Sequence, residues 1–352
     1  MKEFIALDSH KYYSLVEREG VQSCEAKQCR IEHDRGAIRG YLSRCEPGTV
    51  VAVEATGNWY WIVQEIEDAQ LCPALVHPRK AKLMMGMINK TDKLDVHGLN
   101  RLQRNQTLPT VWIPPGDLRD LRELTRTRMV LGHQRTRLKN RILATLSKYG
   151  LLLSREASDP YGATARPLMN QAVAQLPEQA QYVTRALLKQ LDFIQEQIRE
   201  LEQRLKQLVK VTPAMILLMT LPGIGWLLAA VVALEIGDVT RFASAERLAS
   251  YAGTTPRVHS SGGKTRYGGL RPDVNRYLRW ALAEAGNSVA VNHTRQPQRH
   301  VSQLYRRLRE RRGHAKAVGA VARHLAEASF YVLSKNESYR DPALKEGRSM
   351  EG

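Results

Sequence analysis

The sequence predicts a multidomain protein in which an α/β segment is followed by helical segments. The chain has 352 residues, which is more than a single hydrophobic core usually serves. Short apolar runs of the kind that form strands alternate with helical patterns before about residue 113. Long helical patterns dominate after it. We therefore expect domains at residues 1–113, 114–210 and 211–335, with a polar tail at 336–352.

Three apolar runs predict the strands of the first segment. They are FIALDSH, TVVAVEATG and QLCPALVHP, the last of which is ended by Pro78. The pattern NWYWIVQEIEDA between the second and the third run predicts a helix. Strands that alternate with helices imply an at least partly parallel sheet, whose ligands bind at the carboxyl ends of the strands. Asp8 and Glu54 fall at two of these ends.

The middle segment is predicted to be basic, helical and partly coiled coil. TLPTVWIPPGDL, from Thr107 to Leu118, contains three prolines and predicts a linker. One long helix should follow it as far as Gly150. A second helix carries a heptad of apolar residues, Leu191, Ile194, Ile198, Leu201, Leu205 and Leu208. This seam would lie within an intramolecular hairpin or between subunits, and a helix packed on its own domain is the alternative.

The last segment is predicted to be helical, with two glycine-containing motifs. LPGIG, from Leu221 to Gly225, has the form of a helix-hairpin-helix, in which Gly223 and Gly225 let backbone N–H groups approach a phosphate. A plain turn between helices is the alternative. HSSGGKTRYGGLRPDVN predicts a flexible, basic loop.

The formal net charge of +18 predicts a polyanionic partner. Ten Lys and Arg stand against two acids between Arg119 and Arg155, and nine against one acid between Arg295 and His324. Nucleic acid is the commonest polyanion that such helices bind, and a ribosome-associated or membrane-surface protein is the alternative. The candidate nucleic-acid contacts on these helices are Arg126, Arg128, Arg135, Arg137, Lys139, Arg141, Arg306 and Arg307.

The chain is expected to be a soluble, cytoplasmic protein without a membrane partner. The start, MKEFIALDSHKYY, turns charged after one short apolar run and does not resemble a signal peptide. The longest apolar stretch, WLLAAVVALEIG, is too short to span a bilayer and contains Glu235.

Four carboxylates predict a metal site in the first segment. Asp92 and Asp95 in KTDKLDVHG lie three residues apart and so share one face of a helix, where the alternative is a solvated charged face. Asp8 and Glu54 end two predicted strands. Mg²⁺ prefers hard oxygen ligands, and a ribonuclease-H-like sheet builds its two-metal site from such acids. Together the four predict a metal-dependent phosphodiester reaction.

The basic loop offers a nucleophile. Ser260 and Ser261 stand beside glycines and beside Lys264 and Arg266. A serine in a cationic loop can attack a phosphodiester when its hydroxyl is activated and the developing charge is compensated. A loop that only cradles phosphate, with the two cations as its nucleic-acid contacts, is the alternative.

The motifs ALDSH, VEATG, NKTDKLDV, LPGIG, YAGTTPRVHSSGGKTRYGG and NRYLRWAL closely resemble, in order and spacing, those of the DEDD transposases of the insertion-sequence one-hundred-ten family. The resemblance covers about residues 1–335. It implies a RuvC-like, ribonuclease-H-fold N-terminal domain, a coiled-coil middle and a helical C-terminal transposase domain. Members of this family are recombinases of bacterial mobile elements, guided by a bridge RNA that the element encodes.

The resemblance also implies roles for single residues. Asp8, Glu54, Asp92 and Asp95 match the four acids that bind Mg²⁺ in the family, and no other cofactor is implied. Ser261 matches the serine that attacks DNA and becomes linked to a phosphate. Family members work as multimers, which implies a dimer or tetramer in which the acids of one subunit face the serine of another. Target and donor DNA are the implied substrates, and the implied location is the bacterial nucleoid.

Three positions depart from the family pattern. Val96 stands where alanine is usual, and Pro272 stands where lysine is usual, so a phosphate contact there is missing or moved. Ser260 adjoins Ser261, which leaves two alternatives for the nucleophile.

The predicted function is that of an RNA-guided DNA recombinase with a covalent phosphoserine intermediate. A metal-dependent RuvC-like nuclease acting on branched DNA, which needs no serine, and a non-catalytic RNA-binding protein are the alternatives.

Overall fold

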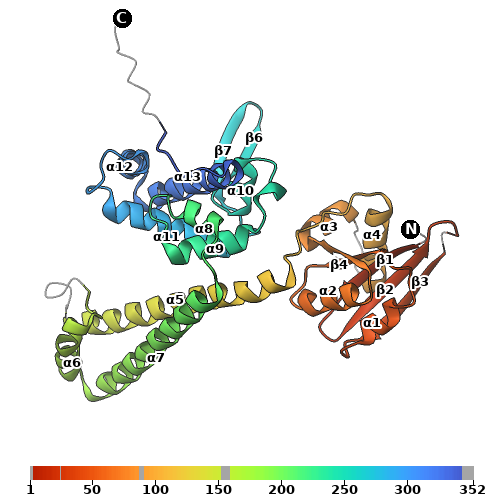
Figure 1. The fold of residues 1–352 in the computed structure, drawn as a ribbon. Coiled ribbons are helices and arrows are strands. Elements are labelled where there is room, and N and C mark those ends of the chain that lie inside the picture. Colours follow the sequence, from red (N-terminus) through yellow and green to blue (C-terminus); the bar gives the residue numbers. More distant parts are fainter. Residues whose placement is uncertain (1–2, 24, 87–90, 152–158, 343–352) are drawn as a thin grey trace, which may run out of the picture. The chain divides into compact units, whose positions relative to one another are not determined.

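The computed structural model describes residues 3–23, 25–86, 91–151 and 159–342. These residues belong to two compact units, Met1–Pro114 and Pro115–Gly352 (Figure 1). Arg155, at the end of the first predicted basic block, and the tail from residue 343 onward lie outside the described residues.

The first unit contains a mixed five-stranded sheet with the strand order β3-β2-β1-β4-β5. Strands β1 (Glu3–Ser9), β4 (Val50–Glu54) and β5 (Cys72–Val76) are parallel, which confirms the partly parallel sheet and its three predicted strands. Strands β2 (Tyr13–Gly20) and β3 (Ala26–Glu32) extend it antiparallel and were not predicted. Most of β3 is exposed, and its polar sequence AKQCRIE lacks the apolar run that marks a buried strand.

Helices cover both faces of this sheet. Helices α1 (Ala37–Leu42) and α2 (Trp59–Asp68) pack on the face that carries Leu7 and Val53. Helix α4 (Asp92–Arg104) packs on the opposite face, where Val96 and Leu99 contact a cluster that includes Ala6 and Ala52. Helix α3 (Pro78–Met85) lies beside α4. The small side chains of the two alanines let α4 approach the strands closely.

Most of the predicted linker belongs to the first unit. Thr110 forms a β-bridge with Val76, and the Val111 amide donates to the Leu75 carbonyl over 2.7 Å. Val111 and Ile113 pack against the core of the sheet. The stretch therefore acts as an additional edge of the fold, and the chain leaves the unit only at its paired prolines.

The second unit begins with a long helical hairpin. Helix α5 (Gly116–Lys148) is followed by the 3-10 turn η2 (Ala163–Ala165) and helix α6 (Arg166–Ala174). Helix α7 (Glu178–Leu208) then runs back along α5 in the same chain (Figure 1). The heptad residues Leu191, Ile194, Ile198 and Leu205 are buried, whereas Leu208 at the helix end is 41% exposed.

The rest of the second unit is a helical bundle that carries one β-hairpin. Its elements in chain order are α8 (Pro213–Leu218), α9 (Trp226–Ile236), η3 (Val239–Arg241), α10 (Ala245–Tyr251), β6 (Pro256–Ser261), β7 (Lys264–Leu270), α11 (Arg276–Asn292), α12 (His300–Arg312) and α13 (His314–Lys335). Apart from Glu235, helix α9 is apolar on every side, and it lies in the core of this bundle. No described helix is long and apolar enough to cross a lipid bilayer.

Candidate metal centre and serine hairpin

The sheet places Asp8 and Glu54 side by side. Leu7 pairs with Val53 in the parallel ladder of β1 and β4, and Asp8 and Glu54 are the next residues on each strand. Neighbouring strands lie about 4.8 Å apart, and side chains alternate between faces, so both acids share the face on which α4 packs. Asp8 is only 6% exposed.

Helix α4 brings two more acids to this face. Thr91 caps the helix by accepting a hydrogen bond from the Leu94 amide, so that Asp92 and Asp95 occupy the first turn. The partial positive charge of a helix N-terminus stabilises acids at these positions. Because α4 packs on β1, the pair lies close to Asp8, so the two acids belong to a cluster and not to a separate solvated face, which was the alternative.

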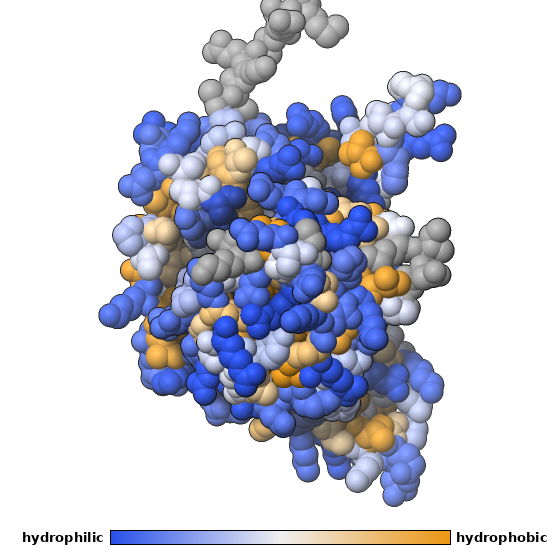
Figure 2. All heavy atoms as spheres, turned by 90° about the vertical axis from the view of Figure 1, so that its right-hand side faces the viewer, coloured by the Kyte–Doolittle hydropathy of each residue, from blue (hydrophilic) through white to orange (hydrophobic). Residues whose placement is uncertain are grey.

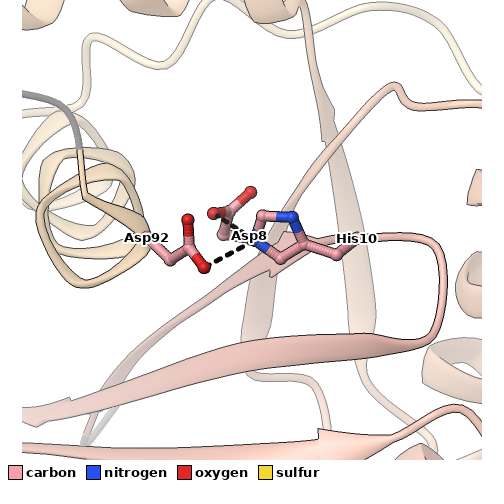
Figure 3. Close-up of side chains that lie close together, drawn as sticks. All are labelled: Asp8, His10 and Asp92. Carbon is pink, nitrogen blue, oxygen red and sulfur yellow. Dashed lines mark ion pairs between the residues drawn. The ribbon is translucent and has the colours of Figure 1, made fainter.

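A histidine that sequence reasoning missed completes the cluster. Nε2 of His10 lies 3.2 Å from Oδ2 of Asp8 and 3.4 Å from Oδ2 of Asp92 (Figure 3). This nitrogen has almost no accessible surface and no partner in hydrogen-bond geometry among the described residues. The signal was present as an Asp and a His two residues apart, which places both side chains on one side of an extended chain.

Tyr13 and Asn58 are further polar side chains around this cluster. The Tyr13 hydroxyl donates to Oδ2 of Asp92 over 2.8 Å, and this hydrogen bond is the main cause that raises the pKa of Tyr13. Nδ2 of Asn58 donates to the His10 carbonyl over 2.8 Å, while Ser9 donates to Oδ1 of the same amide over 3.2 Å. Asn58 therefore ties the segment after β4 to the segment after β1, which keeps Glu54 beside Asp8.

The electrostatics of the cluster favour a bound cation. Burial raises the pKa of Asp8, the interaction with His10 lowers it, and the negative charges of Asp95 and Asp92 raise it again. Ligand atoms of Asp8, His10 and Asp92 lie within 4.8 Å of one another. Carboxylate oxygens are the ligands that Mg²⁺ and Mn²⁺ prefer. The residues at this site therefore fit a divalent metal ion.

The predicted flexible loop is instead a β-hairpin, which corrects that expectation. Ser261 pairs with Lys264 across the two-residue turn Gly262–Gly263, and both glycines have positive φ, 57° and 75°. Only residues that tolerate positive φ at both positions form such a type I′ turn, which matches the twist of the strands. The glycines thus make a tight turn.

The hairpin register separates the two serines. Ser260 pairs with Thr265, and its hydroxyl lies 3.4 Å from that of the threonine. Paired residues share a face and alternate along each strand. Ser261 therefore shares its face with Lys264 and with the next pair of that face, His259 and Arg266. All of these residues are exposed.

The two glycines of the LPGIG turn have different structural roles. Gly223 has φ of 78°, and a Cβ there would lie 2.4 Å from the Ala285 carbonyl oxygen of α11. Its conformation and packing both require glycine. Gly225 has an ordinary extended conformation, with open space where a Cβ would be, and precedes α9. It borders a cavity of about 410 Å³ that is also lined by Arg299 and Ser302.

Several predicted nucleic-acid contacts make ion pairs within the second unit. Arg126 donates two hydrogen bonds to the buried carboxylate of Glu235, over 2.7 and 3.0 Å. Arg128 of α5 is paired with Glu202 of α7. Lys139 lies 3.7 Å from Asp159. The contacts of Arg126 and Arg128 attach α5 to α9 and α7, and all three pairs leave less charge for a nucleic acid than exposed, unpaired cations would.

Other predicted contacts are open to solvent. Arg137 and Arg141 on α5 and Arg306 and Arg307 on α12 are exposed and form no ion pair within the described part of the chain, and Arg135 is half-buried without one. The side of the molecule in Figure 2 is mainly hydrophilic, with apolar residues in separate small spots. Such a surface suits a charged, hydrated partner better than an apolar one.

Comparisons with known proteins identify relatives along most of the chain. Residues 215–302 match the model of the transposase IS116/IS110/IS902 family, and residues 9–151 match the model of DEDD transposases of IS110. A "Probable family 20 transposase" of Pseudomonas aeruginosa is 27% identical over 91% of this chain and 94% of its own. The transposase for insertion sequence element IS1111A of Coxiella burnetii is 28% identical over 82% of this chain and 79% of its own. A pilin gene-inverting protein of Moraxella bovis is 32% identical over 41% of this chain and 45% of its own.

Proposed function

Because the chain belongs to the IS110 family of transposases, we propose that it is an RNA-guided DNA recombinase that cuts and exchanges strands with Mg²⁺ and a serine nucleophile. The family establishes a transposase, and so a DNA strand-transfer enzyme. The metal, the serine, the guide RNA and the oligomer are our proposals. We also propose a cytoplasmic, nucleoid-associated location.

The metal would be held by Asp8, Glu54, Asp92 and Asp95. A bound divalent ion stabilises negative charge that develops on a phosphate during strand transfer. The chain itself would supply the rigid positions, since two acids sit on adjacent parallel strands and two on the capped first turn of α4. Asn58 and Tyr13 would hold these segments in place through their hydrogen bonds.

Ser261 would carry out the covalent step. Its Oγ attacks phosphorus, the bond between phosphorus and the leaving oxygen breaks, and that oxygen takes up the serine proton, so that the leaving strand ends in a hydroxyl. The hydroxyl of a second strand then attacks the phosphoserine, and the serine hydroxyl is restored. No water enters, so the ester bond energy is conserved and strands are exchanged without net hydrolysis. Lys264 and Arg266 on the same face would balance the charge of the phosphate.

The nucleic acids would be held by the exposed basic residues and by the turn at Gly225. A bridge RNA would select target and donor DNA by base pairing, while the protein contacts backbone and shape. Arg137, Arg141, Arg306 and Arg307 are the best placed of the predicted contacts because they are exposed. We also propose a dimer or tetramer, in which the acids of one subunit act with the serine of another.

The single observation that favours Ser261 over Ser260 is its place on the cationic face of the hairpin. Two matched variants test the proposal, Ser261→Ala and Ser260→Ala, each assayed for strand exchange on DNA with the RNA that co-purifies. We expect exchange to be lost only in the first. Undiminished exchange with Ser261→Ala would overturn the serine mechanism, and cleavage without exchange in the wild type would favour the metal-dependent nuclease acting on branched DNA. Absence of strand exchange in the wild type, with nucleic-acid binding unchanged in Asp92→Asn, would instead favour a non-catalytic RNA-binding protein.

A further inference from the structure

We propose that His10 is itself a metal ligand, so that the centre is a mixed nitrogen and oxygen site that binds Mn²⁺ more tightly than Mg²⁺. The inference rests on the proposed metal site and goes beyond its four acids. It is carried by the position of Nε2 of His10 between two carboxylates (Figure 3).

The spacing of the three side chains suits ligands of one ion. Ligands at right angles around an octahedral ion, each at about 2.1 Å, lie about 3 Å from one another. Nε2 of His10 lies 3.2 Å from an oxygen of Asp8 and 3.4 Å from an oxygen of Asp92. Both distances from the nitrogen are therefore already near the separation that neighbouring ligands adopt, and the two carboxylates offer oxygens within 4.8 Å of each other.

The imidazole is held in this position from several sides. The backbone carbonyl of His10 accepts a hydrogen bond from Asn58, and the backbone amide of His10 donates one to the Tyr13 carbonyl over 2.9 Å. The rings of His10 and Tyr13 lie 4.7 Å apart. Nevertheless Nε2, a buried atom, meets hydrogen-bond geometry with no group of the described residues, although it is close to both carboxylates. Two carboxylate oxygens face this nitrogen at 3.2 and 3.4 Å, and a cation shared by all three groups would satisfy them together.

A nitrogen ligand has a consequence for the choice of metal. Mg²⁺ binds oxygen ligands and keeps much of its water, whereas imidazole is a better ligand for transition metals. Four acids alone would favour neither ion strongly. With His10 in the coordination sphere we expect Mn²⁺ to bind at least tenfold more tightly than Mg²⁺ in the wild-type chain.

The test uses Mn²⁺ itself as the probe in the nucleic-acid-free, full-length protein. Pulsed electron paramagnetic resonance detects nitrogen bound directly to Mn²⁺, and loss of the free-ion signal during titration gives the affinity. His10→Gln and His10→Ala are compared with His133→Ala, which changes an exposed histidine of the second unit. Thermal unfolding without metal checks that each variant is folded.

We expect a nitrogen coupling in the wild type and in His133→Ala, and its loss together with the Mn²⁺ preference in both His10 variants. Suppose that Mn²⁺ binds and that Asp92→Asn abolishes this binding. If the wild type then shows no nitrogen coupling, or if the His10 variants keep the coupling, His10 is not a ligand, and the acidic site still stands. Failure of the wild type to bind either ion would overturn the metal centre as well.

Discussion

Tyr13 and Asp92 are joined by a 2.8 Å hydrogen bond between strand β2 and the first turn of α4. Arg30 lies over the Tyr13 ring, 3.8 Å from its centre, and helps to fix the ring. The contact links an antiparallel strand to the helix that carries half of the proposed acids. It therefore gives β2 a role in the site.

Tyr13→Phe should weaken divalent-metal binding by roughly tenfold, because hydrogen bonds to a ligand hold it in its binding orientation. Isothermal titration with Mn²⁺ measures the change. Tyr12→Phe is a matched control, since the Tyr12 side chain is 67% exposed. Equal affinities of the two variants would mean that Tyr13 does not orient Asp92.

Glu235→Gln should destabilise the second unit by about 3 kcal/mol, because it leaves buried cations without their counter-charge. Glu235 is fully buried and accepts hydrogen bonds from Arg126 and from Asn275, the cap of α11. Burial lowers the pKa of the nearby Arg122, and Glu235 opposes this.

Glu202→Gln is the control for that experiment. Its side chain is 34% exposed, so its pair with Arg128 is screened by water and should contribute less than about 1 kcal/mol. Chemical denaturation of both variants gives the two free energies. Equal decreases in the free energy of unfolding would show that the buried ion pair stabilises the fold no more than the exposed pair.

Gly225→Ala should affect nucleic-acid binding, whereas Gly223→Ala should affect stability. The first should leave thermal stability unchanged but weaken nucleic-acid binding, because its methyl group enters the open space before α9. The second should lower stability by at least about 1 kcal/mol, since alanine is strained at positive φ and would strike Ala285. Melting temperature and filter binding separate the two. Unchanged binding by a folded Gly225→Ala variant would assign the turn to packing alone.

Stability should fall as the pH drops below about 6.5, the ordinary pKa of histidine. Burial, with a smaller effect of His300, lowers the pKa of His324. Below this pH the unfolded chain protonates His324, whereas the folded chain resists that protonation. The free energy of unfolding is therefore highest above the unfolded pKa and decreases as the pH falls below it. Unfolding at several pH values should show a shallower slope in His324→Gln than in the wild type or in His133→Gln. Equal slopes in all three would contradict the assignment.

Much of the fold could be predicted where side chains follow a local period. Strands β1 and β4 are continuous apolar runs that end in Asp8 and Glu54, and α4 carries its acids on one face. Strand β3 lies at an edge and is mostly exposed, so it shows no such pattern. The pair Gly262–Gly263 is typical of a tight turn between two strands. The many glycines and charged residues around it nevertheless favoured the prediction of a flexible loop.

The contacts that depend on register could not be predicted in the same way. His10 and Tyr13 meet Asp92 only because α4 packs on β1 at one particular height. Arg126 resembled its basic neighbours in sequence, yet its partner Glu235 is 109 positions away. A local pattern identifies a charged residue, but only tertiary packing decides whether the charge is used inside the protein or remains for a ligand.

The covalent intermediate is the most direct test of the proposed mechanism. The full-length chain with its co-purifying RNA is incubated with the DNA junction of its element and a divalent metal, quenched by denaturation and digested, and the peptides are analysed by mass spectrometry. We predict a nucleotide adduct on the hairpin peptide at Ser261, which is absent in Ser261→Ala and present in Ser260→Ala. DNA that is cleaved and exchanged without any adduct, or with the adduct on Ser260, would contradict this account.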